Sequence, residues 1–178
     1  NYINPNEWIL FWGSDDLANN RFLIEDLIQI INHEQFKYLD LIFNDAIYID
    51  KFGQKERRSS FRIINNNLRL SLFLGFTPPH QGCLFSPKVI KKMKSYSLNY
   101  YLAADLDCFL RMAFMKNIEV KYFEKILVKM SKGGASGRMI KKRFKEVSLI
   151  YKKYFGFLFF IPFITRYIIR ISQFVLKK

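Results

Sequence analysis

The most constraining feature of the chain is a short apolar run that ends in two adjacent carboxylates. The run covers residues 7–12, and Gly13-Ser14 break it directly before Asp15-Asp16. Mostly apolar and aromatic residues bounded by turn residues are typical of a buried strand. We therefore expect a mixed α/β domain in which this strand is central. The carboxylates should lie at its C-terminal end, where open α/β sheets bind their ligands.

Asp15 and Asp16 are candidate ligands of a divalent cation. Paired carboxylates suit Mg²⁺ or Mn²⁺, which prefer carboxylate and phosphate oxygens, so the pair predicts a metal-bound diphosphate. An ordinary acidic turn is the alternative, because Gly, Ser and Asp are common turn residues. On local sequence alone the acidic turn is the simpler interpretation, and other segments of the chain must decide between the two.

Composition limits the class of protein. The 178 residues suffice for one domain with a sizeable core, and 50% hydrophobic content with 17% aromatic residues excludes a disordered chain. The net charge of +14 is uneven, since residues 138–178 carry 11 of the 29 Lys and Arg residues and a single acidic residue. Cys83 and Cys108 lack metal-binding spacing, which predicts buried thiols in a reducing compartment.

Apolar periodicity predicts alternating helices and strands. Helices are expected over 20–32, 68–73, 103–115 and 138–153, with a short helix opening at Ser86-Pro87. Strands are expected over 39–43, 46–49, 83–85 and 118–128. We interpret Asn44-Asp45 as a break between two strands and residues 54–67 as a polar loop.

Four segments, in this order, resemble family 2 glycosyltransferases of the GT-A fold, above all the bacterial enzymes that build capsule, O-antigen or exopolysaccharide. They are Gly13-Ser14-Asp15-Asp16, Pro78-Pro79-His80-Gln81-Gly82, residues 104–111 and Gly133-Gly134-Ala135-Ser136. The resemblance covers about residues 5–137. It implies the acceptor-side part of a Rossmann-like nucleotide-diphospho-sugar transferase, whose base-binding strands belong upstream of Asn1. Gly13 stands where the family's metal motif has Asp or Asn, so that position supplies no ligand.

The resemblance also implies roles for individual residues. Asp15 and Asp16 would hold the metal ion, while His80, Gln81 and Ser136 would contact the donor or its diphosphate. Asp105 would be the general base, with Asp107 and Arg111 as supporting residues. Two structural alternatives remain open: Asp105 as a helix cap or first-turn acid, and residues 133–136 as a flexible linker. Asp107 and Arg111 also have the i, i+4 spacing of an intrahelical ion pair worth roughly 0.2–0.5 kcal/mol.

The C-terminal segment combines basic and apolar residues. Residues 154–164 are almost entirely apolar, and Arg166, Arg170, Gln173 and Lys177 share one face of a helix. A basic face opposite an apolar one predicts a helix lying in the membrane interface, and the basic run from Lys141 adds attraction to anionic lipid. Packing of this helix on its own domain or on a partner subunit is the alternative. We expect two regions, 1–137 as the transferase part and 138–178 as a membrane-associating tail.

Together these features predict an inverting glycosyltransferase. It would move a sugar from a nucleotide-diphosphate donor to a hydroxyl of a lipid-linked or polysaccharide acceptor at the cytoplasmic face of the cell membrane, with Mg²⁺ or Mn²⁺ as cofactor. Charge and aromatic content also suit a nucleic-acid-binding module, which would spread its basic residues along a groove. Here the charge gathers beside the apolar tail instead. A non-catalytic membrane-associated module is the remaining alternative.

Overall fold

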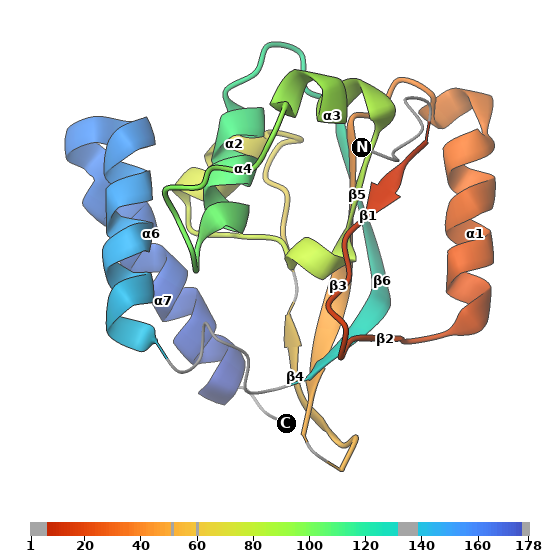
Figure 1. Ribbon diagram of the computed structural model, residues 1–178, viewed down its shortest axis with the longest axis horizontal. Helices are drawn as coiled ribbons and strands as arrows, with labels where there is room; N and C mark the ends of the chain where they lie inside the picture. Colours follow the sequence, from red (N-terminus) through yellow and green to blue (C-terminus); the bar gives the residue numbers. More distant parts are fainter. Residues whose placement is uncertain (1–6, 51, 60, 132–138, 176–178) are drawn as a thin grey trace. The chain divides into compact units, whose positions relative to one another are not determined.

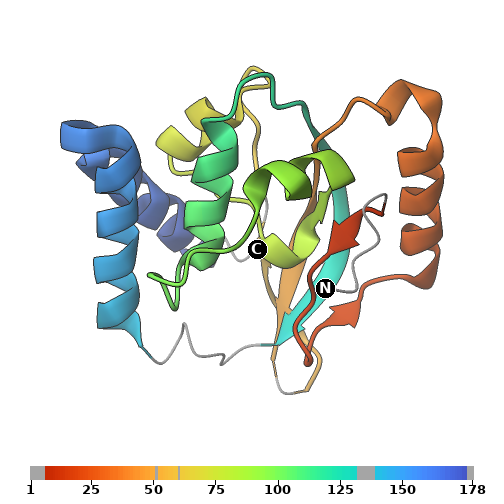
Figure 2. The same cartoon turned by 45° about the horizontal axis from the view of Figure 1, so that its top comes forward.

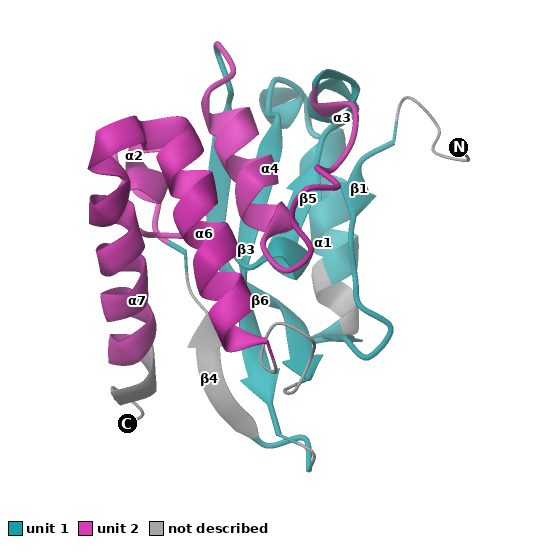
Figure 3. Ribbon diagram, turned by 60° about the vertical axis from the view of Figure 1, so that its left-hand side comes forward, with its two compact units in different colours: residues 1–61, 78–92, 117–131 teal, residues 62–77, 93–116, 132–178 magenta. Residues whose placement is uncertain are grey.

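The computed structural model describes residues 7–50, 52–59, 61–131 and 139–175. The chain divides into two compact units, each built from segments that are far apart in the sequence (Figure 3). Unit 1 comprises residues 1–61, 78–92 and 117–131, and unit 2 comprises residues 62–77, 93–116 and 132–178. Each unit is described separately below.

Unit 1 is built on a six-stranded mixed sheet (Figure 1). Its strands follow the order β1 (Ile9–Leu10), β5 (Cys83–Phe85), β3 (Leu41–Ile49), β6 (Val120–Ser131) and β2 (Leu17–Ala18), and β4 (Lys55–Ser59) also pairs with β3. Strand β3 runs parallel to β6 and antiparallel to β4 and β5. The prediction of a loop over 54–67 is therefore wrong for β4, which is a strand.

Strand β3 is the centre of this sheet, and the prediction that residues 7–12 form the central strand is wrong. Only Ile9 and Leu10 form a strand there, and β1 lies at one end of the strand order, antiparallel to β5. The side chains of β3 are buried almost throughout, whereas those of β1 are half-buried. A strand covered on both faces takes the inner position, because that position removes the most apolar surface from water.

Asn44 and Asp45 lie inside β3, so the predicted break between two strands is also wrong. Both side chains are fully buried and hydrogen-bonded. The Asn44 amide donates to the Gly82 carbonyl at 3.2 Å, and Asp45 Oδ1 accepts from the Tyr122 hydroxyl at 2.9 Å. Buried polar groups with partners cost little, so the strand continues through two residues that usually interrupt strands.

Helix α1 (Arg21–Asn32) packs against the sheet, as its apolar spacing predicts (Figures 1 and 2). Its buried Leu27 joins a core with Ile42, Leu84 and Leu127 from three strands. The neighbouring β3 residue Phe43 stacks edge-on with Phe61, with ring centroids 4.8 Å apart, and such pairs contribute about 0.5–1.5 kcal/mol beyond burial. The short helix α3 (Pro87–Met93) begins where the Ser-Pro pair predicts, because Ser86 Oγ accepts the Val89 N–H.

Unit 2 is helical. It contains α2 (Leu68–Phe73), α4 (Ala104–Ala113), α6 (Ile140–Phe155), the 3-10 turn η3 (Gly156–Phe159) and α7 (Phe160–Val175). Helix α4 contacts α2 and α6, and α7 contacts α2 and α6. Helices α6 and α7 form an antiparallel hairpin, because Phe144 near the start of α6 stacks on Tyr167 in α7 at 4.3 Å (Figure 1). Gly156 permits the reversal with a φ of 55°, a conformation that glycine adopts readily.

The hairpin bears on the membrane prediction. By length and composition, residues 140–172 would suffice to cross a membrane as one helix. However, the chain reverses at Gly156 into two helices of 16 residues each, about 24 Å long and shorter than the ~30 Å hydrocarbon core. Arg166 is also buried and donates to Thr77 Oγ1, so the predicted basic face of a membrane-interface helix is wrong at this residue. A buried guanidinium takes a hydrogen-bond acceptor within its own unit.

Candidate functional site

The acidic turn brings two carboxylates to one point of unit 1. The Asp16 N–H donates to the Gly13 carbonyl at 3.2 Å, and the Gly13 N–H donates to Asp16 Oδ2 at 2.8 Å. A β-carbon built on Gly13 would lie 3.0 Å from Asp16 Oδ2 and 3.2 Å from Asp15 Oδ1. Both carboxylates therefore converge on the space that a side chain at position 13 would fill.

The electrostatics of this turn favour a cation. The pKa of Asp16 is raised above its ordinary value, chiefly because burial penalises the charged form. The hydrogen bond from the Gly13 N–H partly offsets that effect, while the negative charge of Asp15 adds to it. A cation between the two carboxylates would relieve both the repulsion and the loss of solvation.

The donor set fits a metal ion that a substrate helps to hold. Among residues 7–50, 52–59, 61–131 and 139–175 there is no group of three or more His, Cys, Asp or Glu side chains that could hold a metal ion. Mg²⁺ commonly takes only one or two protein carboxylates and completes its shell with water and substrate phosphates. Asp15 and Asp16 supply that number of carboxylates from one exposed turn.

The Pro-Pro-His-Gln-Gly turn lies next to the acidic turn. The Trp12 indole N–H donates to the Gln81 carbonyl at 3.2 Å, and the rings of Phe11 and His80 are 5.3 Å apart. Gly82 anchors this turn on β3, since a β-carbon there would lie 2.5 Å from the Asn44 carbonyl oxygen. The structure thus brings His80 and Gln81 close to the segment that carries Asp15 and Asp16.

The end of β6 reaches the same place. Ser131 Oγ donates to the Asp15 carbonyl at 2.9 Å, and Ser131 is the last residue of β6. The glycine-rich segment begins just after it, and Ser136, predicted to contact the donor, lies outside the described residues. Two of the four segments that carry the family resemblance therefore meet at this corner of unit 1, together with the end of β6.

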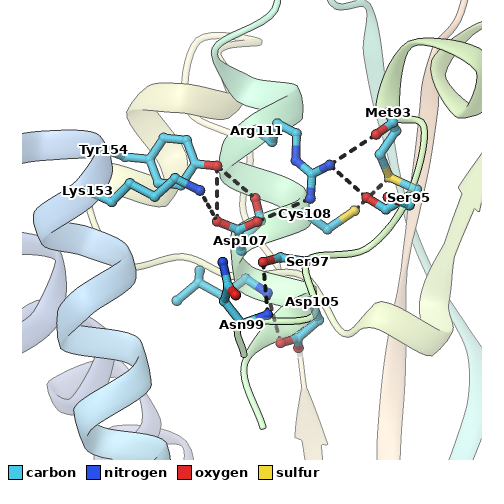
Figure 4. A network of polar contacts seen from close by, with 11 residues as sticks. Met93, Ser95, Ser97, Asn99, Asp105, Asp107, Cys108, Arg111, Lys153 and Tyr154 are labelled. Carbon is cyan, nitrogen blue, oxygen red and sulfur yellow. Dashed lines mark hydrogen bonds and ion pairs between the residues drawn. The ribbon is translucent and has the colours of Figure 1, made fainter. Parts of the chain in front are cut away.

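The fourth segment is helix α4 of unit 2. Asp105 lies in its first turn and accepts the Leu106 N–H at 2.8 Å. Figure 4 shows the Asp105 carboxylate turned away from the neighbouring Asp107. Asp105 is not the cap of the helix, because Ala103 holds that position without a side-chain cap. Glu146 of α6 binds just before the helix, where it accepts the N–H groups of Leu102 at 2.7 Å and Ala103 at 3.1 Å.

Asp107 is the centre of a buried polar network (Figure 4). Its carboxylate pairs with Arg111 at 3.2 Å, as the i, i+4 spacing predicts. It also pairs with Lys153 of α6 at 2.8 Å and accepts the Tyr154 hydroxyl at 3.1 Å. The pKa of Lys153 is raised, chiefly by this hydrogen bond to Asp107, and the pKa of Tyr154 is raised chiefly by burial and then by the Asp107 charge.

Several of these residues were missed by sequence reasoning. Glu146, Lys153 and Tyr154 lie more than 40 positions from their partners in α4, and no spacing rule links residues so far apart. Arg111 has a second function that its spacing did not show, because it donates to the carbonyls of Met93 at 3.0 Å and Ser95 at 2.7 Å. Arg111 thereby holds the segment that follows α3.

Both cysteines are buried and neither forms a disulfide, as their apolar surroundings in the sequence predict. Burial raises the pKa of the Cys108 thiol to about 12, so it stays protonated at neutral pH. A protonated, buried thiol is a poor nucleophile and a poor metal ligand. These cysteines belong to the packing of their units.

Comparison with known proteins identifies a structure with a similar fold. No protein-family model and no curated protein sequence matches the chain. Among solved structures, S. aureus TarS (residues 1–349, in complex with UDP) matches over 82% of this chain with a TM-score of 0.52 and 16% sequence identity. The chain spans 40% of the length of that structure. The match shows that this mixed α/β chain has a glycosyltransferase-like fold.

Proposed function

We propose that this chain belongs to an inverting glycosyltransferase that moves a sugar from a nucleotide-diphosphate donor to a hydroxyl group. The acceptor is a lipid-linked glycan or polysaccharide. The observation that carries the proposal is the meeting of the acidic turn, the His80–Gln81 turn and the end of β6 in unit 1. The glycosyltransferase-like fold supports it, and the UDP bound to TarS supports a nucleoside diphosphate as the leaving group.

Asp15 and Asp16 are the residues that we assign to the divalent cation. Their carboxylates converge beside Gly13, where no side chain competes for the space. Bound Mg²⁺ or Mn²⁺ would supply positive charge to the leaving diphosphate. The neighbouring His80–Gln81 turn offers further polar groups to the donor.

Asp105 is the residue that we assign as general base. In this reaction the acceptor O–H gives its proton to the Asp105 carboxylate while its oxygen attacks the anomeric carbon. The bond from that carbon to the diphosphate oxygen breaks, and its electron pair leaves with the nucleoside diphosphate. Asp105 suits this role because, within the described part of the chain, its carboxylate accepts a hydrogen bond from the Leu106 N–H alone, whereas Asp107 is engaged with Arg111 and Lys153. The helix N-terminus also stabilises the carboxylate form.

The test separates binding from transfer in the full-length protein. Mn²⁺ with UDP is titrated while tryptophan fluorescence is recorded, because Trp12 lies beside the acidic turn. Cleavage of the donor, with water in place of the acceptor hydroxyl, is measured as UDP release from a panel of UDP-hexoses. Asp105→Asn should lower UDP release by at least about 100-fold and leave Mn²⁺·UDP affinity unchanged, since a general base contributes roughly 10²–10⁴-fold. Asp16→Asn should weaken Mn²⁺·UDP binding itself.

Asp26→Asn is the matched control, because Asp26 is a half-exposed carboxylate on α1 whose partner is Lys125. It should match the parent in both assays. Parent-level UDP release by Asp105→Asn would remove Asp105 from the mechanism. If Asp16→Asn also bound Mn²⁺·UDP like the parent, the catalytic proposal would fail and the non-catalytic module would stand.

A further inference from the structure

The outer side of helix α7 carries an apolar stripe that the described residues of unit 2 leave exposed. It consists of Phe160, Ile164, Ile168 and Ile171, each between 41% and 62% exposed. Their spacing of three or four residues places them on one face of the helix. The buried Pro162 and Arg166 lie on the opposite face of α7, which packs toward α2 and its following turn. The stripe is about 17 Å long, from the helical rise over 11 residues.

The adjoining helix α6 contributes positive charge to the same outer surface. Its exposed lysines Lys141, Lys145 and Lys152 share one face of the helix. The opposite face, with Val147 and Tyr151, is buried in unit 2. Because α6 and α7 pack side by side and both bury their inner faces, the lysines and the apolar stripe border each other.

Negative charge is missing from this surface. Glu146 is the sole acidic residue in the sequence from 138 to 178, and it is buried with its carboxylate committed to the N–H groups before α4. A second copy of the chain docked here would bring the same lysines against these ones. Charge complementarity therefore selects an anionic partner with an apolar interior beneath its charged surface.

We propose that the α6–α7 hairpin docks the protein flat on an anionic lipid bilayer, with the α7 stripe inserted among the acyl chains and the α6 lysines on the headgroups. Neither helix spans the bilayer, because each is shorter than the hydrocarbon core. An in-plane hairpin buries its apolar face at the boundary of headgroups and acyl chains. This contact is independent of sugar transfer, so it can be tested without donor or acceptor.

The experiment is liposome flotation of the full-length protein with vesicles of phosphatidylcholine, alone or mixed with phosphatidylglycerol. The parent should float with the mixed vesicles, and high salt should weaken this binding without abolishing it. Ile164→Ser and Ile168→Ser should each weaken it about tenfold, from the lost burial of an isoleucine side chain. Lys145→Gln and Lys152→Gln should each weaken it about fivefold at low salt.

Matched controls come from other exposed positions. Leu98→Ser removes a fully exposed leucine that is not part of the hairpin, and Lys91→Gln removes an exposed lysine of α3. Both should float like the parent, and circular dichroism checks that every variant is folded. The proposal is overturned if the parent stays with the unbound fraction, or if the Ile164 and Ile168 variants float like Leu98→Ser. Concentration-dependent dimers that Ile168→Ser dissociates, without vesicle binding by the parent, would make the stripe a subunit interface instead.

Discussion

Gly13 is the residue that leaves space between the two carboxylates of the acidic turn. Its lack of a side chain leaves room for one oxygen from Asp15 and one from Asp16. The pKa of Asp16 is raised chiefly by burial, and the negative charge of the neighbouring Asp15 adds to this effect. Perturbed carboxylates of this kind are more frequent at functional sites than in ordinary turns.

Gly13→Ala tests this arrangement. The added methyl carbon would lie 3.0–3.2 Å from both carboxylate oxygens, so both side chains must move by a few tenths of an ångström. We expect Mn²⁺·UDP affinity to fall about tenfold while the free energy of unfolding changes by less than about 0.5 kcal/mol, because the turn is exposed. Fluorescence titration and urea unfolding measure the two quantities.

Ser14→Ala in the same turn is the control, since Ser14 is exposed. It should bind Mn²⁺·UDP like the parent. Unchanged affinity in Gly13→Ala would show that the convergence of the two carboxylates has no function.

At the scale of elements, the α4–α6 pair depends on Asp107. One buried carboxylate holds Arg111 from its own helix and Lys153 and Tyr154 from α6. Glu146 links the same two helices at the start of α4. These contacts orient the first turn of α4, which carries Asp105.

The network predicts that the free energy of unfolding falls as the pH becomes alkaline. The folded state raises the pKa of Lys153 above its ordinary 10.5, so this stabilisation is complete below 10.5 and is lost as pH rises through the raised pKa. The raised pKa of Tyr154 acts in the same direction. Asp107→Asn should lower the free energy of unfolding by about 2 kcal/mol at neutral pH and flatten its decline in alkali. Urea unfolding followed by circular dichroism at increasing pH measures both effects.

Asp105→Asn is the control on the same helix, and it should keep the alkaline decline. An alkaline decline in Asp107→Asn as steep as that of the parent would show that the coupling of Lys153 and Tyr154 to Asp107 does not stabilise the fold.

At the scale of the whole molecule, the chain forms two units that each combine distant segments. The C-terminal hairpin belongs to unit 2, where it contacts α2 and α4. One face of the hairpin thus packs on its own unit while the opposite face stays exposed. Packing within the protein therefore accounts for one face of these helices. The membrane contact that we propose concerns the opposite, exposed face.

The reactivity of the two cysteines measures the packing of each unit separately. Cys83 lies in unit 1 and Cys108 in unit 2, and both are fully buried. We expect iodoacetamide to label both far more slowly in native buffer than in urea, because labelling requires local opening and a thiolate. Peptide mass spectrometry assigns the label, and glutathione serves as the exposed reference thiol. Labelling of either cysteine at the glutathione rate in native buffer would contradict the packing of that unit.

The sequence by itself predicted the elements whose signals are local. Examples are the apolar spacing of α1, the bounds of α2 and the start of α3 at a Ser-Pro pair. In each case, the residues that produce the feature lie within one or two helical turns of it. The acidic turn and its neighbour around His80 were also recognised as candidate site segments. Such features depend on backbone preferences and on periodic burial, which a reader of the sequence can see directly.

Only the tertiary structure decided which polar residues are buried and which strand is central. Asn44 and Asp45 continue β3 because Gly82 and Tyr122, far along the chain, form hydrogen bonds with the Asn44 amide nitrogen and the Asp45 carboxylate. Arg166 turns inward because Thr77 accepts its hydrogen bond. The cost of burying a polar group depends on partners that local sequence does not reveal, and in a folded chain those partners come from distant segments.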